Sequence, residues 1–457
     1  MKIKLQGITP FSDTITPPPS KSQTMRALVF ALLAQGRSTI FNPLISPDTL
    51  AMIKAIQQLG AKVTLHKEKH QNNYINKISV IGTNSHLKSY SKTIDAQNSG
   101  LILRLIGALL GLLPTTTTLT GDESVQKNRI VAPLILGLRT LGATVDCCNH
   151  NHQKSPYHQR PPLKIKGPIK SGKITIDGQD SQPVSAFLIA LAFLKGPSEI
   201  LVKNAGEKPW IDLTLSWLDF LKISYLRKGY SYFKLLGNAQ ISGFNYTVPA
   251  DFSSLSYPLA LAFLTNSHLK INGLNFQDQQ GDKVFISTLK KMGADLAVDK
   301  KNGFLEIKKK AETAKTSVSK IKSTALKPLK INAGSMIDMV PLLAVISTFA
   351  KGKTLIYNAL SSRFKESDRL KSICSELKKM GAKIEEKPDG LIIYPSVLKG
   401  AELISYQDHR IALALTIAAL SIRSTSILNG VECIAKTYPN FIDKLKQLNQ
   451  KIKLTNL

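Results

Sequence analysis

The sequence predicts an α/β protein made of two pseudo-symmetric domains, each containing three similar units. With 457 residues, the chain is too long for one ordinary hydrophobic core and is expected to form at least two domains. Hydrophobic residues make up 43% of it, which indicates packed cores rather than disorder. One phrase, an amphipathic helix followed by a turn and a strand, occurs six times and gives three units per domain.

The six copies of this phrase share apolar residues at helical spacing, most followed by β-branched residues typical of strands. They are IKAIQQLGAKV from Ile53, LILGLRTLGATV from Leu134, LSWLDFLKISY from Leu215, ISTLKKMGADLAV from Ile286, ICSELKKMGAKIEE from Ile373 and FIDKLKQLNQKIKL from Phe441. Four copies place a glycine directly after the helix, where a C-terminal cap requires a positive φ angle. Their spacing of about 70–90 residues is too long for an ordinary array of helical repeats.

Three polar inserts separate the units, at residues 66–93, 146–162 and 308–327. Their composition predicts surface loops or extended hairpins. The second insert contains two cysteines and three histidines, at Cys147, Cys148, His150, His152 and His158. Because this spacing matches no established metal-binding pattern, a solvent-exposed loop is favoured over a metal site.

The net charge of +30 favours anionic partners, namely nucleic acid, acidic lipid or phosphorylated metabolites. The lysines are spread along the chain, so a surface that is merely rich in lysine is an equal alternative. A nucleic-acid-binding protein would interleave aromatic residues with the basic ones, and this pattern is not apparent. There is no apolar run of bilayer length, no signal-peptide pattern and no disulfide framework among the four cysteines, which predicts a cytoplasmic protein.

Several segments place polar or charged residues at the start of an apolar helix, where backbone N–H groups can meet an anion. In PPPSKSQTMR, Ser20 or Ser22 can cap the helix, and Lys21 and Arg26 add positive charge about one turn apart. QNSG leads to Gly100 in the same way, and DGQDSQ precedes another apolar helix. Each of these segments, taken alone, is explained equally well as a capped helix start.

The second half of the chain carries three further segments of this kind. RFKESDRL, at residues 363–370, has five charged residues in seven, which a solvated helix start or a phosphate-binding and proton-transfer site would both explain. Asp408 is a natural N-cap, whereas Arg410 opens a nearly uncharged helix, so a carboxylate or phosphate partner is expected for it. Asp338 lies in the apolar stretch MIDMVPLLAVISTFA and is either a buried cap or a base with a shifted pKa.

Six segments, in their order along the chain, resemble segments of the 3-phosphoshikimate 1-carboxyvinyltransferase (EPSP synthase) family. They are PSKSQTMRA, QNSGLILR, KPWIDLTL, RFKESDRL, DHRIALA and AKTYP. The resemblance covers essentially the whole chain. It implies the enolpyruvyl transferase fold, an inside-out, barrel-like α/β arrangement of two domains with three βαβαββ units each. It also implies that residues 1–20 with 250–457 form the domain that carries the acid and base and part of the phosphoenolpyruvate clamp. Residues 21–249 would form the domain that binds shikimate 3-phosphate.

The resemblance further implies the reaction. The enolpyruvyl group of phosphoenolpyruvate is transferred to the 5-hydroxyl of shikimate 3-phosphate by addition and elimination, with release of phosphate, in chorismate biosynthesis. The expected partners are these two small molecules, without nucleic acid or membrane, and the expected state is a monomer. No metal ion and no organic cofactor is expected.

The same resemblance assigns roles to individual residues. Asp338 would take the proton from the attacking hydroxyl, Glu366 would donate a proton to the methylene carbon, and Lys21 is counted as catalytic with them. The residues expected to bind shikimate 3-phosphate are Lys21, Ser22, Arg26, Ser181, Gln182, Asp338 and Lys365. Those expected to bind phosphoenolpyruvate are Lys21, Gly100, Arg129, Gln182, Arg369, Arg410 and Lys436, with His409 beside the clamp.

The sequence departs from the family pattern at several of these positions. A one-residue insertion after Gly121-Asp122 would make Arg129 the clamp arginine, and without it Asn128 would stand there. Asp180 replaces the first serine of a Ser-Ser-Gln segment and is expected to point away from a bound phosphate. Trp210, Glu207 and Ser361 also differ from the usual residues. The related UDP-N-acetylglucosamine carboxyvinyl transferase has a reactive loop cysteine, and no cysteine lies near Arg129.

Overall fold

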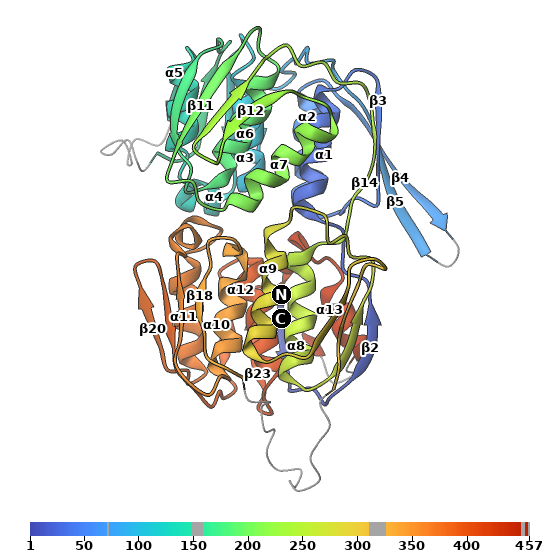
Figure 1. Ribbon diagram of the computed structural model, residues 1–457, viewed down its shortest axis with the longest axis vertical. Coiled ribbons are helices and arrows are strands. Elements are labelled where there is room, and N and C mark those ends of the chain that lie inside the picture. The colour runs from blue at the N-terminus through green and yellow to red at the C-terminus, as the bar shows by residue number, and fades with distance from the viewer. Residues whose placement is uncertain (71–72, 148–158, 310–325, 449–452, 456–457) are drawn as a thin grey trace, which may run out of the picture. The chain divides into compact units, whose positions relative to one another are not determined.

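The computed structural model of the chain describes residues 1–70, 73–147, 159–309, 326–448 and 453–455 (Figure 1). The chain forms two compact units. Unit 1 contains Met1–Pro18 and Ala250–Leu457, and unit 2 contains Pro19–Pro249. The expected boundaries, at residues 20 and 250, differ from these by two residues at the first crossing.

Unit 2 has three four-stranded sheets in the described residues. The first sheet, in the order β14-β3-β5-β4, consists of β14 (Asn245–Thr247), β3 (Arg37–Phe41), β5 (Asn73–Ile81) and β4 (Lys62–His70). The second consists of β6 (Thr93–Asp95), β7 (Thr117–Thr120), β9 (Leu163–Lys166) and β8 (Thr144–Cys147). The third consists of β10 (Lys173–Asp177), β11 (Ser198–Lys203), β13 (Tyr232–Leu235) and β12 (Tyr225–Lys228).

Unit 1 also has three four-stranded sheets in its described part. They are β2 (Ser12–Ile15), β15 (His268–Ile271), β17 (Phe304–Ile307) and β16 (Leu296–Asp299); then β18 (Lys330–Asn332), β19 (Thr354–Tyr357), β21 (Gly390–Ile393) and β20 (Ile384–Lys387); and β22 (Glu402–Ile404), β23 (Ser426–Asn429), β1 (Lys2–Leu5) and β24 (Lys453–Thr455). All six sheets share one pattern, a parallel first pair followed by two antiparallel pairings. This repetition confirms the prediction of six similar units in two domains.

The helices lie inside the sheets, as Figure 1 shows for each unit. In unit 2 they are α1 (Lys21–Leu33), α2 (Pro47–Gln58), α3 (Gly100–Leu110), α4 (Glu123–Asn128), α5 (Ala132–Thr140), α6 (Ser181–Ala192) and α7 (Lys208–Phe220). In unit 1 they are α8 (Phe252–Leu264), α9 (Val284–Met292), α10 (Val340–Thr348), α11 (Arg369–Lys379), α12 (His409–Leu420) and α13 (Phe441–Leu448). Every residue of α8, α10 and α12 is buried, which suits helices that are apolar on all sides.

The predicted glycine caps after four of the helices are present. Gly60, Gly142, Gly293 and Gly381 have φ angles of 108°, 99°, 106° and 86°. The third copy of the repeated phrase has no glycine at this place, and Lys222 adopts the left-handed conformation there with φ of 56°. The chain turn at the end of these helices is therefore the same whether or not glycine is available.

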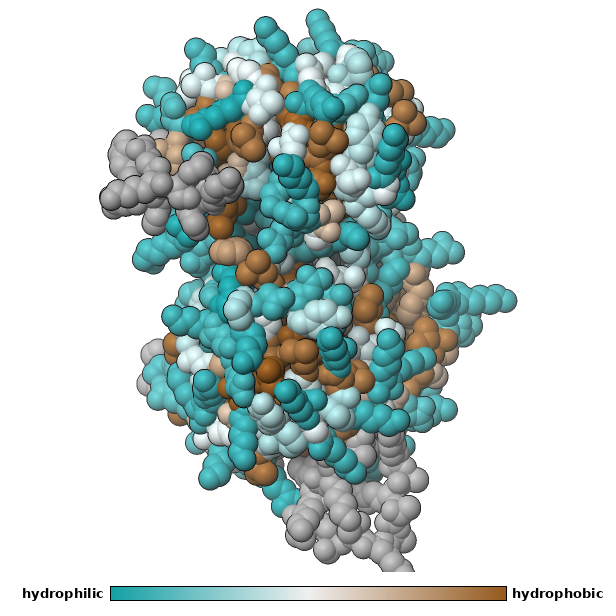
Figure 2. Space-filling model, turned by 60° about the vertical axis from the view of Figure 1, so that its left-hand side comes forward, coloured by the Kyte–Doolittle hydropathy of each residue, from teal (hydrophilic) through white to brown (hydrophobic). Residues whose placement is uncertain are grey.

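The polar inserts are described only in part. Within residues 66–93, strands β4 and β5 form the expected extended hairpin. Cys148, His150, His152 and His158 lie outside the described residues, and so does most of the third insert. None of the described helices is both long enough and apolar enough to cross a lipid bilayer. On the face shown in Figure 2, hydrophilic side chains predominate and hydrophobic ones occur in small groups.

Candidate functional site

The helix starts singled out in the sequence are capped by side chains. Ser20 accepts a hydrogen bond from the backbone N–H of Gln23 at the start of α1, so Ser20 rather than Ser22 is the cap. Ser99 caps α3, and Asp180 and Asp408 cap α6 and α12. These caps satisfy some of the exposed N–H groups of each helix and leave the others to attract an anion.

Four of the helices in unit 2 meet at their N-terminal ends. Arg26 of α1 is buried and donates from Nε to Thr214 Oγ1 at 2.9 Å and from a terminal nitrogen to the Trp210 carbonyl at 3.2 Å, which ties α1 to the start of α7. Glu207, directly before α7, accepts from the Ser181 hydroxyl of α6 at 2.9 Å. These contacts bring the positive ends of α1, α6 and α7 together.

The start of α3 joins this group through an ion pair. Arg104 of α3 lies 3.3 Å from Asp180, the cap of α6, and donates to the Ile130 carbonyl at 2.7 Å. Asp180, which stands where the family usually has a serine, therefore has a cationic partner in Arg104. The predicted site residues Lys21, Ser22, Arg26, Gly100, Ser181 and Gln182 all belong to the first turns, or in the case of Arg26 the second turn, of these helices.

Gly100 lies against two arginines. A Cβ atom added to Gly100 would lie 3.0 Å from Arg129 Cζ and 3.2 Å from Arg104 Nη1, which is closer than ordinary van der Waals contact. Arg129 is buried, with 4% of its surface exposed, whereas Asn128 is only half-buried. The absence of a side chain at residue 100 thus leaves room for the guanidinium of Arg129.

Several expected ligand-binding side chains of unit 2 already have protein partners. Lys21 Nζ lies 3.2 Å from Asp48 Oδ2, and Ser181 donates to Glu207. The side-chain oxygen of Gln182 is buried and has no hydrogen-bond partner among the described residues. Because a buried polar atom without a partner is costly, Gln182 is a strong candidate to contact a ligand. Asp48 and Glu207 were not predicted as site residues.

The residues predicted for the second half of the site converge on Arg369 in unit 1. Its Nη1 lies 2.6 Å from Asp338 Oδ1 and its Nη2 lies 2.7 Å from Glu366 Oε2. Its Nε lies 2.8 Å from Asp408 Oδ2. Arg369 is only 1% exposed, so one buried guanidinium holds three carboxylates in fixed positions.

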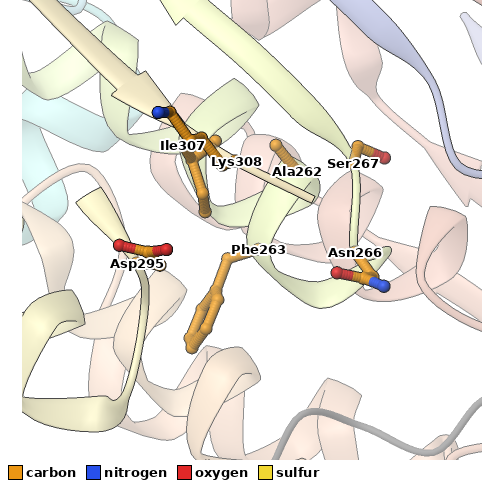
Figure 3. Close-up of a pocket in the computed structure, with 7 residues that line it drawn as sticks. All are labelled: Ala262, Phe263, Asn266, Ser267, Asp295, Ile307 and Lys308. Atoms are coloured by element: carbon orange, nitrogen blue, oxygen red, sulfur yellow. The ribbon is translucent and has the colours of Figure 1, made fainter. Parts of the chain in front are cut away.

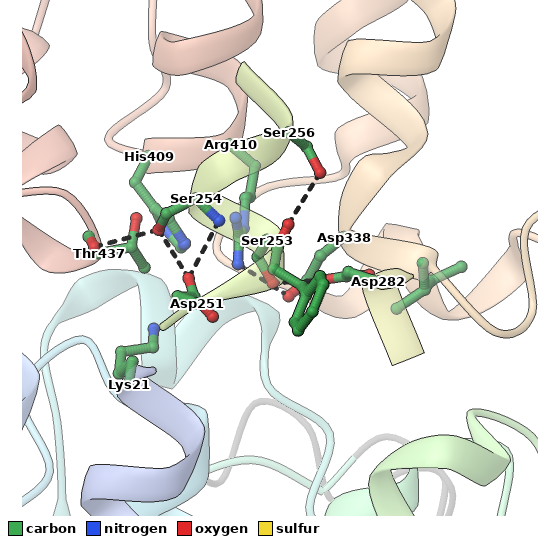
Figure 4. A network of polar contacts seen from close by, with 12 residues as sticks. Lys21, Asp251, Ser253, Ser254, Ser256, Asp282, Asp338, His409, Arg410 and Thr437 are labelled. Carbon is green, nitrogen blue, oxygen red and sulfur yellow. Dashed lines mark hydrogen bonds and ion pairs between the residues drawn. The ribbon is translucent and has the colours of Figure 1, made fainter. Parts of the chain in front are cut away.

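Two further cations complete this network. Lys436 Nζ donates to Glu366 Oε1 at 2.7 Å. Arg410 Nη2 donates to Asp338 Oδ2 at 3.3 Å (Figure 4). Lys365 is buried next to Glu366 in the chain. The structure thus brings together Asp338, Glu366, Arg369, Arg410 and Lys436, which are separated by up to 98 positions in the sequence.

Asp408 has a larger part in this network than the sequence indicated. The prediction gave it only the role of an N-cap, which it fills by accepting from the backbone N–H of Arg410 at 2.9 Å. It is also completely buried, binds Arg369 and accepts from the Ser367 hydroxyl at 3.1 Å. The sequence signal was an acid two residues before an arginine at the start of an apolar helix. The partner, Arg369, was not identifiable from sequence spacing.

The arginines control the ionisation of Asp338. Burial opposes its ionisation, but the positive charges of Arg410, Arg369 and Lys365 outweigh this effect and hold the pKa of Asp338 well below its usual range. Burial likewise disfavours the charged form of Arg369, yet Asp408, Glu366 and Asp338 raise the pKa of Arg369 above its already high value. The Asp338 carboxylate and the Arg369 guanidinium are therefore both charged at neutral pH.

Two other features of unit 1 have some characteristics of a binding site. Glu366, Asp408 and His409 have potential metal-ligating atoms within 4.8 Å of one another, but Arg369 and Lys436 already bind the two carboxylates, and their charges would repel a metal ion. A small surface pocket (Figure 3) is lined by Ala262, Phe263, Asn266, Ser267, Asp295, Ile307 and Lys308. None of the predicted site residues lines it.

Comparison with known proteins identifies the family. The model of the EPSP synthase (3-phosphoshikimate 1-carboxyvinyltransferase) family matches residues 5–445. The 3-phosphoshikimate 1-carboxyvinyltransferase of Chlamydia caviae is 38% identical over 445 residues, covering 97% of this chain and 92% of the relative. That of Chlamydia pneumoniae is 36% identical over 443 residues, covering 95% and 91%.

Solved structures agree at the level of the fold. An EPSP synthase structure from Acinetobacter baumannii superimposes with a TM-score of 0.75 over 100% of both chains, at 24% sequence identity. This likeness confirms the predicted enolpyruvyl transferase fold, including its inside-out arrangement of helices and sheets. The chain therefore belongs to the EPSP synthase (3-phosphoshikimate 1-carboxyvinyltransferase) family.

Proposed function

We propose that this chain transfers the enolpyruvyl group of phosphoenolpyruvate to the 5-hydroxyl of shikimate 3-phosphate, the reaction of its family. The observation that carries the proposal is the buried network of unit 1. It holds the expected base, Asp338, and the expected acid, Glu366, on a single guanidinium. A protein that only binds anions would not need two carboxylates fixed among its cations.

The proposed chemistry requires a proton to leave one atom and to arrive at another. The 5-hydroxyl attacks C2 of phosphoenolpyruvate and gives its proton to Asp338, while Glu366 gives a proton to C3. The tetrahedral adduct then loses phosphate by cleavage of the bond between C2 and the phosphate oxygen. C3 returns its proton to Glu366, and the proton held by Asp338 leaves with the phosphate. Arg369, Arg410 and Lys436 offset the negative charge that the two substrates bring to the site.

Asp338 is a weak base in the ligand-free protein, because Arg369 and Arg410 hold its pKa low. The carboxylate of phosphoenolpyruvate is proposed to bind these same two arginines. Its negative charge would draw the guanidinium groups away from Asp338 and raise the pKa of that side chain toward a value useful for catalysis. In this way the base becomes competent only when the donor substrate is bound.

The groups of unit 2 are proposed to bind the phosphates. Lys21, Ser22, Arg26, Ser181 and Gln182 would bind shikimate 3-phosphate, and Lys21, Gly100, Arg129 and Gln182 would bind phosphoenolpyruvate. The converging helix N-termini support this assignment, since they supply N–H donors and positive partial charge. The Ser181 hydroxyl would exchange Glu207 for the ligand phosphate.

The remaining properties are proposals of the same kind. We infer a cytoplasmic monomer that acts on small molecules and needs neither metal ion nor organic cofactor. The excess of lysine and arginine, 61 against 31 acidic residues, is attributed to the surface and to the anion-binding groups rather than to a nucleic-acid partner.

A phosphate-release assay tests the proposed function. With phosphoenolpyruvate present, shikimate 3-phosphate is expected to support turnover, and free shikimate is expected to support at least about 100-fold less, because it cannot engage the phosphate-binding groups of unit 2. UDP-N-acetylglucosamine serves as the second acceptor. Equal turnover with shikimate and its phosphate, or preference for the nucleotide sugar, would contradict the proposal.

The clamp arginine is tested by a matched pair of neighbouring variants. Arg129→Ala is expected to raise the KM for phosphoenolpyruvate by about tenfold or more, because Arg129 is the buried residue that lies against Gly100. Asn128→Ala should change that KM by less than about twofold. Steady-state kinetics at saturating shikimate 3-phosphate measures both values. The reverse order of effects would show that Asn128 occupies the clamp position.

A further inference from the structure

A carboxyl group outside the proposed machinery is buried beside it in unit 1. Asp282 lies in a short helical turn, Gly281–Lys283, and is only 1% exposed. Its Oδ2 accepts a hydrogen bond from the Ser253 hydroxyl of α8. Its other oxygen, Oδ1, is buried and has no hydrogen-bond partner in the described residues. Half of this carboxyl group is therefore neither solvated nor paired, which is unusual for a structural aspartate.

The backbone around Asp282 is firmly held. The side-chain oxygen of Gln280 accepts from the backbone N–H of Phe252 at 2.9 Å, and its nitrogen donates to the Ala250 carbonyl at 3.0 Å. These two bonds attach the turn to the start of α8, whose residue Ser253 holds the carboxyl group. The position of Asp282 is thus fixed by the fold and does not depend on its own charge.

The positive charge of the Arg410 guanidinium favours the ionised form of Asp282. Arg410 is 3% exposed, and its Nη2 donates to Asp338. Its Nε and Nη1 are buried without a hydrogen-bond partner in the described part of the chain. Burial disfavours the charged form of Arg410, whereas the Tyr257 hydroxyl, Asp338, Asp282 and Asp251 favour it and raise the pKa of Arg410. Figure 4 shows these acids grouped around Arg410.

We propose that Asp282 is a positioning residue that sets the availability of Arg410 for the carboxylate of phosphoenolpyruvate. When Asp282 is neutral, the open donors of Arg410 are free to bind the substrate. When Asp282 is ionised, its carboxylate competes with the substrate for the same guanidinium. The inference rests on the proposed function, in which Arg410 binds phosphoenolpyruvate, and adds a residue that no feature of the reaction otherwise requires.

The ionisation of Asp282 falls in a range where the competition matters. Burial, reinforced by the negative charge of Asp338, raises the pKa of Asp282 to about 7, while Arg410 and the Ser253 hydroxyl oppose the rise and Asp251 adds to it. The charged side chains of the adjoining α9, Lys290 and Lys291, are exposed to solvent. Near neutral pH, Asp282 therefore exists in both forms.

The test compares wild type with Asp282→Asn, which keeps the size of the side chain but cannot ionise. The KM for phosphoenolpyruvate is measured from about pH 6 to about pH 8.5 at saturating shikimate 3-phosphate. The ratio of wild-type to variant KM is expected to rise by about fivefold to tenfold over this range, while the ratio of kcat values stays nearly constant. Because the titration of phosphoenolpyruvate affects the KM of both enzymes equally, it cancels in the ratio of the two KM values.

Two further variants sharpen the result. Ser253→Ala removes a hydrogen bond that favours the ionised form, so the rise in KM should begin at higher pH than in wild type. Asp295→Asn, an exposed aspartate of the same unit, is the matched control and should follow the wild-type profile. A merely structural Asp282 would alter stability without moving the pH profile of KM.

A thermal measurement separates the two proposals. Because the folded-state pKa of Asp282 is raised from the ordinary value of 3.8 to about 7, the fold loses stability as pH rises from about 4 to about 7, and the loss is complete above that range. Asp282→Asn should therefore raise Tm relative to wild type at about pH 8.5, and the difference should shrink by about pH 5. If wild type and Asp282→Asn are both active and their KM values for phosphoenolpyruvate change with pH in parallel, this inference is wrong and the proposed function is unaffected. An inactive wild type would overturn the proposed function and the inference with it.

Discussion

An Asp338→Asn variant is expected to retain its fold and to lose about 10²- to 10⁴-fold in kcat. Asparagine has the size of aspartate but cannot accept the proton of the attacking hydroxyl. The KM for phosphoenolpyruvate should change much less, because Arg369 and Arg410 lose a protein carboxylate and remain available to the substrate. Steady-state kinetics over both substrates measures the two effects separately.

The matched control is Asp443→Asn, since Asp443 belongs to the same unit and its side chain is 72% exposed. It should leave kcat within about twofold of wild type. Glu366→Gln, the corresponding change at the proposed acid, should resemble Asp338→Asn in its loss of kcat. Turnover near the wild-type value in either variant would remove that residue from its assigned role.

An Arg369→Met variant is expected to lose about 3–5 kcal/mol of stability in unit 1. Methionine has a similar length, but it removes the cation shared by three carboxylates. Asp338 keeps Arg410 and Glu366 keeps Lys436, whereas Asp408 loses its arginine partner. Asp408 is the most costly of these, because it is completely buried. The deficit should diminish as pH falls, because protonation of the Asp408 carboxyl group removes a buried charge that has lost its cation.

The measurement must report on unit 1. Both tryptophans, Trp210 and Trp217, lie in unit 2, so calorimetry or far-ultraviolet circular dichroism is preferred to fluorescence. Arg363→Met is the matched control, since Arg363 also bonds two carboxylates, Asp368 and Glu386, which are 33% and 35% exposed. It should cost no more than about 1 kcal/mol. A loss of equal size in the two variants would contradict the central role of Arg369.

Much of the fold was predictable because it depends on local chemistry. Helical spacing of apolar residues marked the six repeated units, and glycines such as Gly60 marked where four of the helices end. The caps at Ser20 and Asp408 follow from the hydrogen-bonding capacity of short polar side chains. Lys222 was not predictable in the same way, because its left-handed conformation is imposed by the chain turn rather than favoured by lysine.

The site was predictable only where residues are adjacent in a motif. The motif around Glu366 and the one around Arg410 are visible in the sequence, and the family resemblance gave their proposed roles. Side-chain pairs across helices, such as Asp408 with Arg369 or Glu207 with Ser181, are set by how the helices pack. No sequence spacing encodes them, so the wider role of Asp408 appeared only in the structure.

The sheet that contains β1 has a consequence for the order in which the chain acquires structure during synthesis. Strand β1 precedes unit 2 in the chain and pairs with β23 and β24, which follow unit 2. The ribosome therefore releases all of unit 2 before the partners of β1 exist, so unit 2 can complete its core while unit 1 is still unfinished. The buried ion pair of Arg369 and Asp408 lies in unit 1, so the network around Arg369 can form only after all of unit 2 has been synthesised.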